Sequence, residues 1–228
     1  MGNLFLVSTP IGNLKDITYR AIEVLRLVNL IVCEDTRVTG KLLKHYKIKK
    51  NLLSFEEHNV QRRIPLILKL LKNGGNIVLV SDAGTPTLSD PGYKLVRECI
   101  KRGIEVESIP GPSAILTALT VSGLPTDKFL FAGFPPKTSL KRKKFIKNLS
   151  TINYKRLTII MFESPHRIIY TLKDMKTIFG DIDICLCREL TKLYEEKRRE
   201  MVSEAIEHFK RVKPKGEITV VFSLNTKY

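Results

Sequence analysis

The segment Ile77–Gly92 reads IVLVSDAGTPTLSDPG. Its first four residues are apolar, which predicts a strand buried in a parallel sheet. The remaining residues are rich in Gly, Pro, Ser, Thr and Asp. Ligands of open α/β sheets bind at the carboxyl ends of the strands, so this loop is either a ligand-binding loop or an ordinary strand-to-helix turn. In the first case, Gly84 would permit close backbone approach, and Asp82 or Asp90 would accept hydrogen bonds from ligand hydroxyls.

Strand-like and helix-like segments alternate on either side of this loop. In the first half we expect strands at 4–7, 30–33, 52–54, 77–80 and 105–109, with helices at 18–27, 39–46, 61–72, 93–102 and from 110 to about 119. This order predicts a mostly parallel sheet with helices on both faces. After a seam at 122–126, we expect strands at 129–131, 157–162, 182–187, 194–199 and 217–222, with helices at 140–149, 165–179 and 203–212. The sequence therefore predicts two α/β domains, 1–122 and 126–228, with a cleft between them.

The charge of the chain is strongly positive. Its 228 residues contain 39 Lys and Arg against 23 Asp and Glu, for a net charge of +16. Basic residues are grouped at 44–50, 137–147, 198–199 and 210–215. A polyanionic partner, above all a nucleic acid, is the natural inference. The alternative is that these residues only form solvated faces.

Several other classes of protein are disfavoured. No apolar run is long enough to cross a membrane, and no signal peptide is evident, so we expect a cytoplasmic protein. The four cysteines lack metal-ligand spacing, and we expect reduced, buried thiols and no metal site. The loop after the first strand, Ser8–Asn13, matches neither a G-x-G-x-x-G loop nor a Walker A loop. This argues against ordinary dinucleotide binding and nucleotide hydrolysis.

Polar loops follow other predicted strands as well. They are Ser8–Asn13, Glu34–Arg37, Pro110–Ala114 and Phe162–Arg167. Each alone has a simple structural explanation, such as a surface ion pair, a helix cap or an exposed first turn. Together they repeatedly place polar groups at one edge of a sheet.

Six motifs occur in an order that resembles a known family. They are Ser8–Leu14, Glu34–Arg37, Ser81–Gly92, Pro110–Ala114, Phe162–Arg167 and Arg188–Lys192. The chain is similar over nearly its whole length to the ribosomal RNA small-subunit methyltransferase I family, within the tetrapyrrole methylase fold. The resemblance implies two α/β domains, each a mixed sheet flanked by helices. It also implies S-adenosylmethionine in the cleft between the domains, a homodimer, and 2'-O-methylation of a cytidine ribose in the decoding region of small-subunit (16S) rRNA or of the assembled small subunit.

The resemblance also implies roles for individual residues. The expected cofactor contacts are Pro10, Ile11, Gly12, Asp82, Ala83, Gly84, Thr85, Ser113, Ala114, Met161, Phe162 and Leu190. Glu163 or Asp35 is expected to act as general base, because a ribose hydroxyl is a poor nucleophile. Arg37, His166 and Arg167 would orient phosphate or ribose. Lys141, Arg142, Lys143 and Lys144, with Arg167, are expected to bind RNA.

Two other functions stay open at this point. One is methyl transfer by the same fold to a tetrapyrrole or another small molecule, although the net charge favours RNA. The other is a non-catalytic RNA-binding or ribosome-assembly protein. Relatives often carry a helical C-terminal extension after the last strand, and its work in RNA binding would here fall to the basic runs or to a second subunit.

Overall fold

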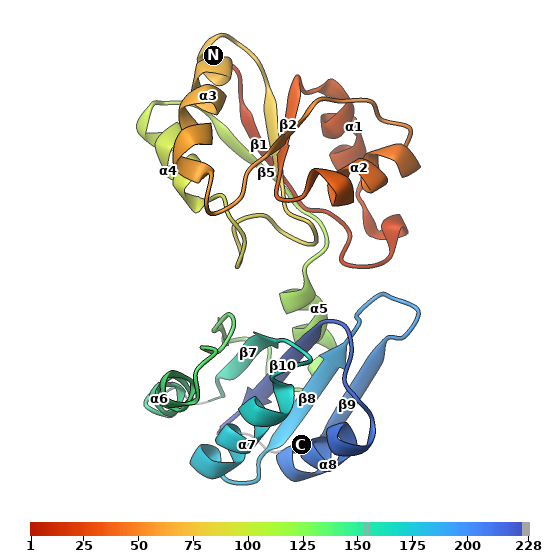
Figure 1. Cartoon of the computed structure of the whole chain (residues 1–228), viewed down its shortest axis with the longest axis vertical. Coiled ribbons are helices and arrows are strands. Elements are labelled where there is room, and N and C mark those ends of the chain that lie inside the picture. Colours follow the sequence, from red (N-terminus) through yellow and green to blue (C-terminus); the bar gives the residue numbers. More distant parts are fainter. Residues whose placement is uncertain (153, 155, 225–228) are drawn as a thin grey trace. The chain divides into compact units, whose positions relative to one another are not determined.

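The computed structural model describes residues 1–152, 154 and 156–224. The chain divides into two compact units, Met1–Ser113 and Ala114–Tyr228. Each unit contains one five-stranded sheet (Figure 1). The division lies ahead of the seam expected at 122–126, so the helix that was expected to end the first domain groups with the second unit.

The first unit is built on a parallel sheet. Its strands are β1 (Leu4–Val7), β2 (Leu30–Cys33), β3 (Leu52–Ser54), β4 (Ile77–Val80) and β5 (Val106–Ile109), in the spatial order β3-β2-β4-β1-β5. All four strand pairs are parallel. The helices are α1 (Tyr19–Leu27), α2 (Thr36–His45), α3 (Val60–Lys72) and α4 (Tyr93–Lys101), with the short 3-10 helix η1 (Leu14–Asp16) before α1.

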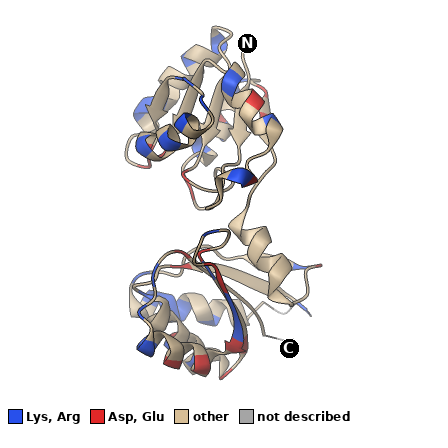
Figure 2. Cartoon of the chain, turned by 90° about the vertical axis from the view of Figure 1, so that its right-hand side faces the viewer, with Lys and Arg blue, Asp and Glu red and all other residues tan. Residues whose placement is uncertain are grey.

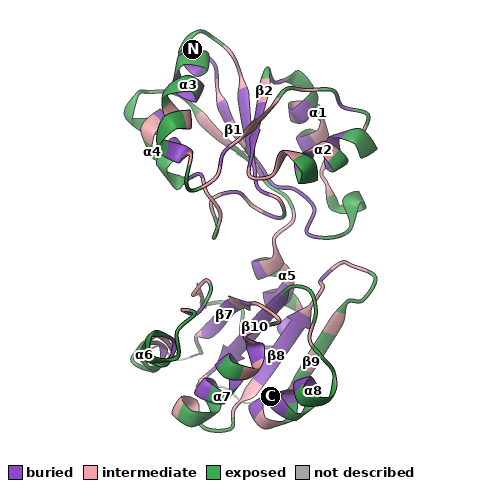
Figure 3. Ribbon diagram, viewed as in Figure 1, coloured by how far each residue is buried: buried purple, intermediate pink, exposed green. Residues whose placement is uncertain are grey.

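The central strands of this sheet are apolar on both faces because helices cover both faces. Ile77 and Leu79 of β4 pack against α3 and α4, whereas Val78 and Val80 belong to the core under α1 and α2. The two helix pairs lie on opposite sides of the sheet (Figure 1). Successive side chains of a strand point to opposite faces, so a continuous apolar run is what this position requires. Figure 3 shows the resulting buried centre and exposed outer helix faces.

The second unit contains a mixed sheet. Its strands are β6 (Phe129–Phe131), β7 (Thr158–Glu163), β8 (Asp183–Arg188), β9 (Glu196–Met201) and β10 (Ile218–Ser223), in the order β6-β7-β10-β8-β9. Among the described strand pairs of this second sheet, only β6 and β7 run parallel. The helices are α5 (Ala114–Ser122), α6 (Ser139–Ser150), α7 (Ile168–Phe179) and α8 (Val202–Arg211).

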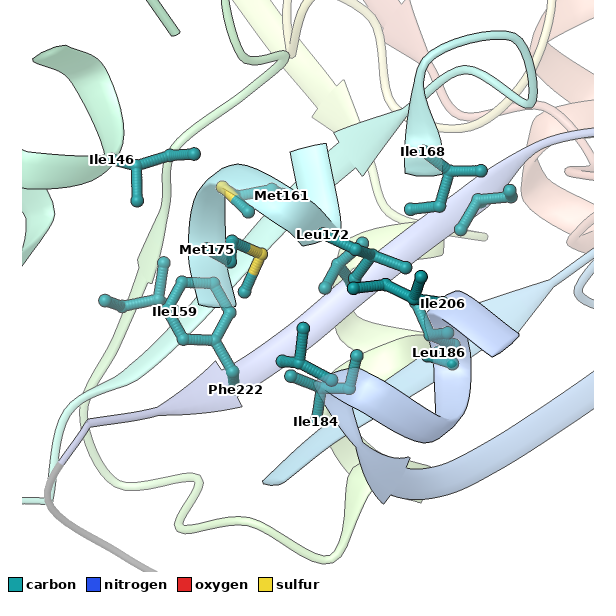
Figure 4. Packing of buried hydrophobic residues seen from close by; sticks show 14 of the residues in the cluster. Ile146, Ile159, Met161, Ile168, Leu172, Met175, Ile184, Leu186, Ile206 and Phe222 are labelled. Carbon is teal, nitrogen blue, oxygen red and sulfur yellow. The ribbon is translucent and has the colours of Figure 1, made fainter. Parts of the chain in front are cut away.

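One hydrophobic core joins this sheet to α6, α7 and α8. Met161, Leu186 and Phe222 from the strands meet Leu172 and Ile206 from the helices (Figure 4). Helix α5 also packs against β10. This contact with the central strand explains why α5 belongs to the second unit.

The predicted elements are all present; β1, β2, β3, β4 and β6 have the expected bounds, and other elements have shifted ends. The helix expected from residue 165 begins at Ile168, because the backbone N–H groups of Arg167 and Ile168 both donate to the Ser164 carbonyl in a turn, each at 3.0 Å. The strand expected at 194–199 is displaced to Glu196–Met201. Its start is delayed by turns in which Lys192 N–H donates to Glu189 O and Glu195 N–H donates to Lys192 O.

Candidate functional site

The loops after β1 and β4 are joined at the carboxyl edge of the first sheet. The backbones of Thr9 and Gly84 exchange two hydrogen bonds of 2.9 Å, which makes an isolated antiparallel bridge. The Thr9 hydroxyl also donates to the carbonyl of Ser81 at 3.1 Å, within a buried environment. Because β1 and β4 are neighbours in the sheet, these contacts close the two loops into one rigid unit.

The loop after β5 is held to the same unit. The Thr85 hydroxyl lies 3.2 Å from the Ser8 hydroxyl and donates to the carbonyl of Pro112 at 3.3 Å. A Cβ at Gly111 would lie only 3.0 Å from the Ser8 Cβ, so the chain approaches β1 more closely there than a side chain comfortably allows. The structure thus brings together the motifs Ser8–Asn13, Ser81–Gly92 and Pro110–Ser113 at one sheet edge, as expected.

Gly84 has the backbone conformation that this junction requires. Its φ is +80°, in the region that L side chains rarely adopt, and a Cβ there would lie 3.4 Å from Ile11 Cγ2. Thr87 and Ser89, farther along the loop, also have positive φ values of 75° and 66°. Positive φ at non-glycine residues is strained backbone, and such residues concentrate at ligand-binding loops.

Four carboxylates gather near this edge, at the ends of β2 and β4. Burial raises the pKa of Asp90 to about 6, and the charge of Asp82 contributes to that shift. Burial likewise raises the pKa values of Asp82 and Glu34, and the other carboxylates raise them further. The Asp82 carboxylate accepts a hydrogen bond of 3.0 Å from the Asp35 backbone N–H, which ties the loop after β2 to the loop after β4. This edge is therefore suited to a cationic ligand.

Asp35 has two roles of its own. As the N-cap of α2 it accepts from the Arg37 backbone N–H at 2.7 Å, and it forms an ion pair with the Arg37 guanidinium at 2.6 Å. Hydrogen bonds from Arg37 lower the pKa of Asp35 to about 2. Its side chain is 25% exposed and that of Arg37 is 86% exposed. The pair is accessible, and Arg37 presents most of its cation to solvent.

Glu163, at the end of β7 in the second unit, is enclosed. Its side chain has no exposed surface and forms an ion pair of 2.8 Å with Arg167. The Ser164 backbone N–H donates to Glu163 Oε1 at 2.7 Å, and the Thr171 hydroxyl donates to Oε2. Arg167 in turn donates to the Pro135 carbonyl at 3.0 Å. In this arrangement the carboxylate reaches no solvent and organises the loop after β7.

The other predicted contacts of the second unit differ in exposure. Met161 is fully buried in the core, so its side chain does not face a ligand. Leu190 is 6% exposed, between two residues of positive φ, Glu189 and Thr191. Phe162 is half-buried and stacks edge-on against Phe131, while His166 is exposed.

The basic helix α6 carries the lysines expected to bind RNA, with one correction. Lys141, Lys143 and Lys144 are exposed, whereas Arg142 is 5% exposed and forms an ion pair of 2.7 Å with Asp174 of α7. Arg142 also donates to the Lys137 carbonyl at 3.2 Å. The assignment of Arg142 to the RNA surface is therefore wrong, because the helix turns that position toward α7.

Two members of the carboxylate group, Glu34 and Asp90, are not predicted from the sequence as a group with Asp82. Glu34 belongs to the motif Glu34–Arg37, and Asp90 is expected only to accept hydrogen bonds from ligand hydroxyls. The signal for Glu34 is its position directly after a buried strand, and the signal for Asp90 is its place in the polar loop that follows β4. Among the described residues, no group of three or more His, Cys, Asp or Glu side chains is placed to hold a metal ion. Within the same residues, no helix has the length and apolarity of a membrane span.

Comparison with known proteins gives consistent results. Residues 3–206 match the family model described as tetrapyrrole (corrin/porphyrin) methylases. A Thermotoga maritima protein named ribosomal RNA small subunit methyltransferase I is 53% identical over 98% of this chain and 99% of its own length. The Escherichia coli O157:H7 protein of the same name is 44% identical over 96% of this chain and 77% of its own length.

Solved structures with a similar fold are more distant in sequence. A diphthine synthase superposes with a TM-score of 0.73 at 15% identity, over 97% of this chain and 90% of the other. The uroporphyrin-III C-methyltransferase of Thermus thermophilus, in complex with S-adenosyl homocysteine, superposes with a TM-score of 0.65 at 18% identity, over 98% of both chains. These likenesses show the fold.

Proposed function

The chain belongs to the ribosomal RNA small subunit methyltransferase I family of the tetrapyrrole methylases, and on that premise we propose that it methylates the ribose 2'-hydroxyl of a cytidine in the decoding region of 16S rRNA, with S-adenosylmethionine as donor. The observation that carries the proposal is the junction of three loops at the carboxyl edge of the first sheet. We further propose that the protein acts as a homodimer in the cytoplasm, on rRNA or on the small subunit.

The residues at this edge fit the cofactor. S-adenosylmethionine carries a sulfonium and an ammonium group, and the carboxylates Glu34, Asp82 and Asp90 supply negative charge beside the loop junction. Gly84 has no side chain to obstruct the approach of a ligand to the backbone next to Ile11. Pro10, Ile11, Gly12, Ala83, Thr85 and Ser113 would complete the contacts from the first unit. Ala114, Phe162, Leu190 and the backbone at Met161 would add contacts from the second unit.

The cofactor, when bound, supplies an activated methyl group, so the main task of the protein is alignment of the acceptor hydroxyl. Arg37 is the residue best placed to orient a phosphate, because its guanidinium is exposed yet held by Asp35. A fixed guanidinium loses less rotamer freedom when it binds an anion than a free side chain does. His166 is exposed in the loop after β7, and it would help to orient a phosphate from the second unit.

Of the two carboxylates expected to act as base, we propose Asp35 for the reacting centre and a positioning role for Glu163. Asp35 is accessible, whereas Glu163 has no exposed side-chain surface. A carboxylate whose pKa is lowered to about 2 is a weak base. Asp35 would therefore accept a hydrogen bond from the ribose hydroxyl and orient it, and most of the rate acceleration would come from alignment.

The decisive experiment is methyl transfer from radiolabelled S-adenosylmethionine to small subunits, to naked 16S rRNA and to a tetrapyrrole. We expect label in rRNA and, after alkaline hydrolysis, in an uncleaved dinucleotide whose 5' nucleotide is cytidine, because a 2'-O-methyl group blocks hydrolysis at its own linkage. Labelling of the tetrapyrrole alone would support the small-molecule alternative. Cofactor binding by calorimetry without methylation of any acceptor would support a non-catalytic RNA-binding protein.

The Asp35→Asn variant tests the assignment of the acceptor contact. Asparagine caps a helix about as well as aspartate, so α2 should stay folded. We expect kcat to fall by about 10²-fold or more, with cofactor affinity within a factor of a few. Parental kcat in this variant would remove Asp35 from the reacting centre.

Sedimentation of the purified protein tests the dimer. We expect twice the 26.0 kDa mass of one chain at micromolar concentration. A species of one chain mass that is fully active would contradict this part of the proposal.

A further inference from the structure

A basic hollow lies at the amino edge of the first sheet, away from the loop junction. It has a volume of about 920 Å³ and is lined by the end of α1, by α2 and by the segment that leads into β3. Four of its lining residues are lysines, namely Lys44, Lys47, Lys49 and Lys50. No Asp or Glu is among the lining residues. Figure 2 faces the α1–α2 side of the first unit and shows basic segments in blue.

The four lysines are available to a ligand. Lys44, Lys47 and Lys49 are exposed and Lys50 is half-buried. Within residues 1–152, 154 and 156–224, none of the four forms an ion pair with a carboxylate. Most arginines and lysines of the second unit's outer strand β9, in contrast, are paired: Lys197 with Glu195, and Arg198 with Glu200. The hollow is therefore a concentration of uncompensated positive charge.

Lys47 stands at a position where glycine is usual. It follows the end of α2 with φ of +54°, its N–H donates to Lys44 O at 3.1 Å, and Ile48 N–H donates to Leu43 O at 2.9 Å. This is a Schellman end, in which glycine is preferred because other residues pay a steric cost on the order of 1 kcal/mol. Compared with glycine, the lysine at this position makes the helix end less stable, and it adds a cation to the hollow.

The rest of the hollow favours a backbone of phosphates over a small molecule. The cations are on flexible stems around an open depression, and they provide point charges with no fixed hydrogen-bond pattern. A second hollow of about 310 Å³ shares Asn29 and Asn51 with the first and continues along the amino edge. Its lining residues also include no acidic side chain. An extended anion can follow this track.

We propose that the hollow binds the phosphate backbone of the substrate RNA without regard to sequence, at a distance from the nucleotide that is methylated. The strands between the two edges are four residues long at β2 and β4, or about 13 Å. The carboxylates at the carboxyl edge suit a cationic cofactor, and the lysines at the amino edge add attraction for phosphates away from it. This inference rests on the proposed function for the identity of the RNA.

The test uses the full chain with substitutions that remove equal charge. Lys44→Gln with Lys49→Gln neutralises the hollow, and Lys69→Gln with Lys94→Gln neutralises two exposed lysines outside it, on α3 and α4. Binding to a 16S rRNA fragment is measured by fluorescence anisotropy at several salt concentrations. We expect the hollow variant to lose roughly tenfold in affinity and its salt slope to fall by about 1.5, because each lost phosphate contact removes about 0.7–0.9. The control pair should keep the parental slope.

The Lys47→Gly variant separates binding from folding. Glycine relieves the positive φ, so the midpoint of thermal unfolding should stay the same or rise, while the salt slope falls by about 1. Parental slopes in both hollow variants, or equal losses in the control pair, would overturn the proposal. The outcome does not depend on turnover: a protein that fails to methylate rRNA can still show the slope change, and an active enzyme can lack it.

Discussion

At the scale of single residues, Gly84 determines whether the three loops can meet. Its backbone pairs with Thr9, and its positive φ places the N–H and carbonyl toward that partner. The hydroxyls of Thr9 and Thr85 then bind carbonyls of the neighbouring loops. The junction is therefore held by short polar contacts that need a residue able to adopt positive φ.

Gly84→Ala should damage cofactor binding, and Gly103→Ala provides a control. Both glycines have positive φ, but a Cβ at Gly103 would meet nothing within 4 Å, whereas one at Gly84 would contact Ile11 at 3.4 Å, within the proposed cofactor site. We expect both variants to lose about 1 kcal/mol of stability, since alanine is strained at positive φ. Only Gly84→Ala should weaken binding of S-adenosylmethionine in calorimetry. Equal cofactor affinities in the two variants would show that the junction does not contact the cofactor.

Asp90 should make stability depend on pH in a definite direction. Its pKa is raised from 3.8 to about 6, so between these values the folded protein binds more protons than the unfolded chain. The contribution of Asp90 to stability is therefore greatest below pH 4 and is lost as the pH rises through 6. Asp90→Asn should raise stability at pH 7, by on the order of 1 kcal/mol after solvent screening, and much less at pH 4.

Urea unfolding at pH 4, 5, 6 and 7 measures this effect. The difference in unfolding free energy between Asp90→Asn and the parent should grow with pH across the window. A difference that is constant with pH would contradict a raised pKa at Asp90. Glu34 and Asp82 shift in the same direction, so cofactor affinity should also increase from pH 5 to 7 as a cationic ligand meets ionised carboxylates.

Glu163→Gln distinguishes a positioning residue from a base. The amide cannot form an ion pair with Arg167 and loses an acceptor for Ser164 or Thr171, so we expect a loss of about 3–5 kcal/mol in stability. Thr171→Val removes one hydrogen bond and should cost about 1 kcal/mol. If Glu163 were the base, kcat of the folded variant would in addition fall by about 10²-fold or more, whereas a positioning residue leaves most of kcat in the molecules that stay folded.

At the scale of elements, α6 shows how a basic run is divided by helix geometry. Consecutive residues of a helix point in different directions, so one cation of Lys141–Lys144 is buried against α7 while the three lysines are exposed. Of these lysines, Lys143 lies 3.9 Å from the carboxylate of Asp174. The inward cation is Arg142, which is paired with Asp174 and lies one turn before buried Ile146 on α6. Within this one basic run, Arg142 thus stabilises the fold, and the lysines add positive charge to the surface.

Arg142 and Lys144 should respond differently to neutralisation. Arg142→Ala leaves Asp174 buried without its closest cation and should cost about 3–5 kcal/mol. Lys144→Gln should change stability by less than about 0.5 kcal/mol. Chemical denaturation measures both effects. Equal stability of the two variants would place Arg142 on the surface.

At the scale of the whole molecule, the two proposed RNA surfaces lie on different units. The hollow belongs to the first unit, and the lysines of α6 belong to the second. Because they share no residues, their contributions to RNA binding should add. A variant with Lys44, Lys49, Lys143 and Lys144 all changed to Gln should lose the sum of the two salt slopes. A loss equal to that of the hollow variant alone would remove α6 from the RNA surface.

The sequence alone determined the order and type of the elements. Periods of apolar residues specify strands and helices locally, and the Gly- and Pro-rich loop at Ser81–Gly92 marks the carboxyl end of β4. Six ordered motifs were enough to identify the family, and the comparisons confirmed it. The net charge pointed to RNA but did not say which cations face it.

The tertiary structure decided what each charged side chain does. Glu163 and Arg142 look like surface groups in the sequence, but burial and partners distant along the chain enclose them. Glu34, Asp82 and Asp90 come together only because β2 and β4 are neighbours in the sheet, and the lysine hollow exists only because α2 packs beside the entry to β3. Helices and strands follow from the steric and solvation preferences of residues that are neighbours in the sequence. The burial of a charged side chain and its electrostatic interactions depend on contacts that form only when the chain folds.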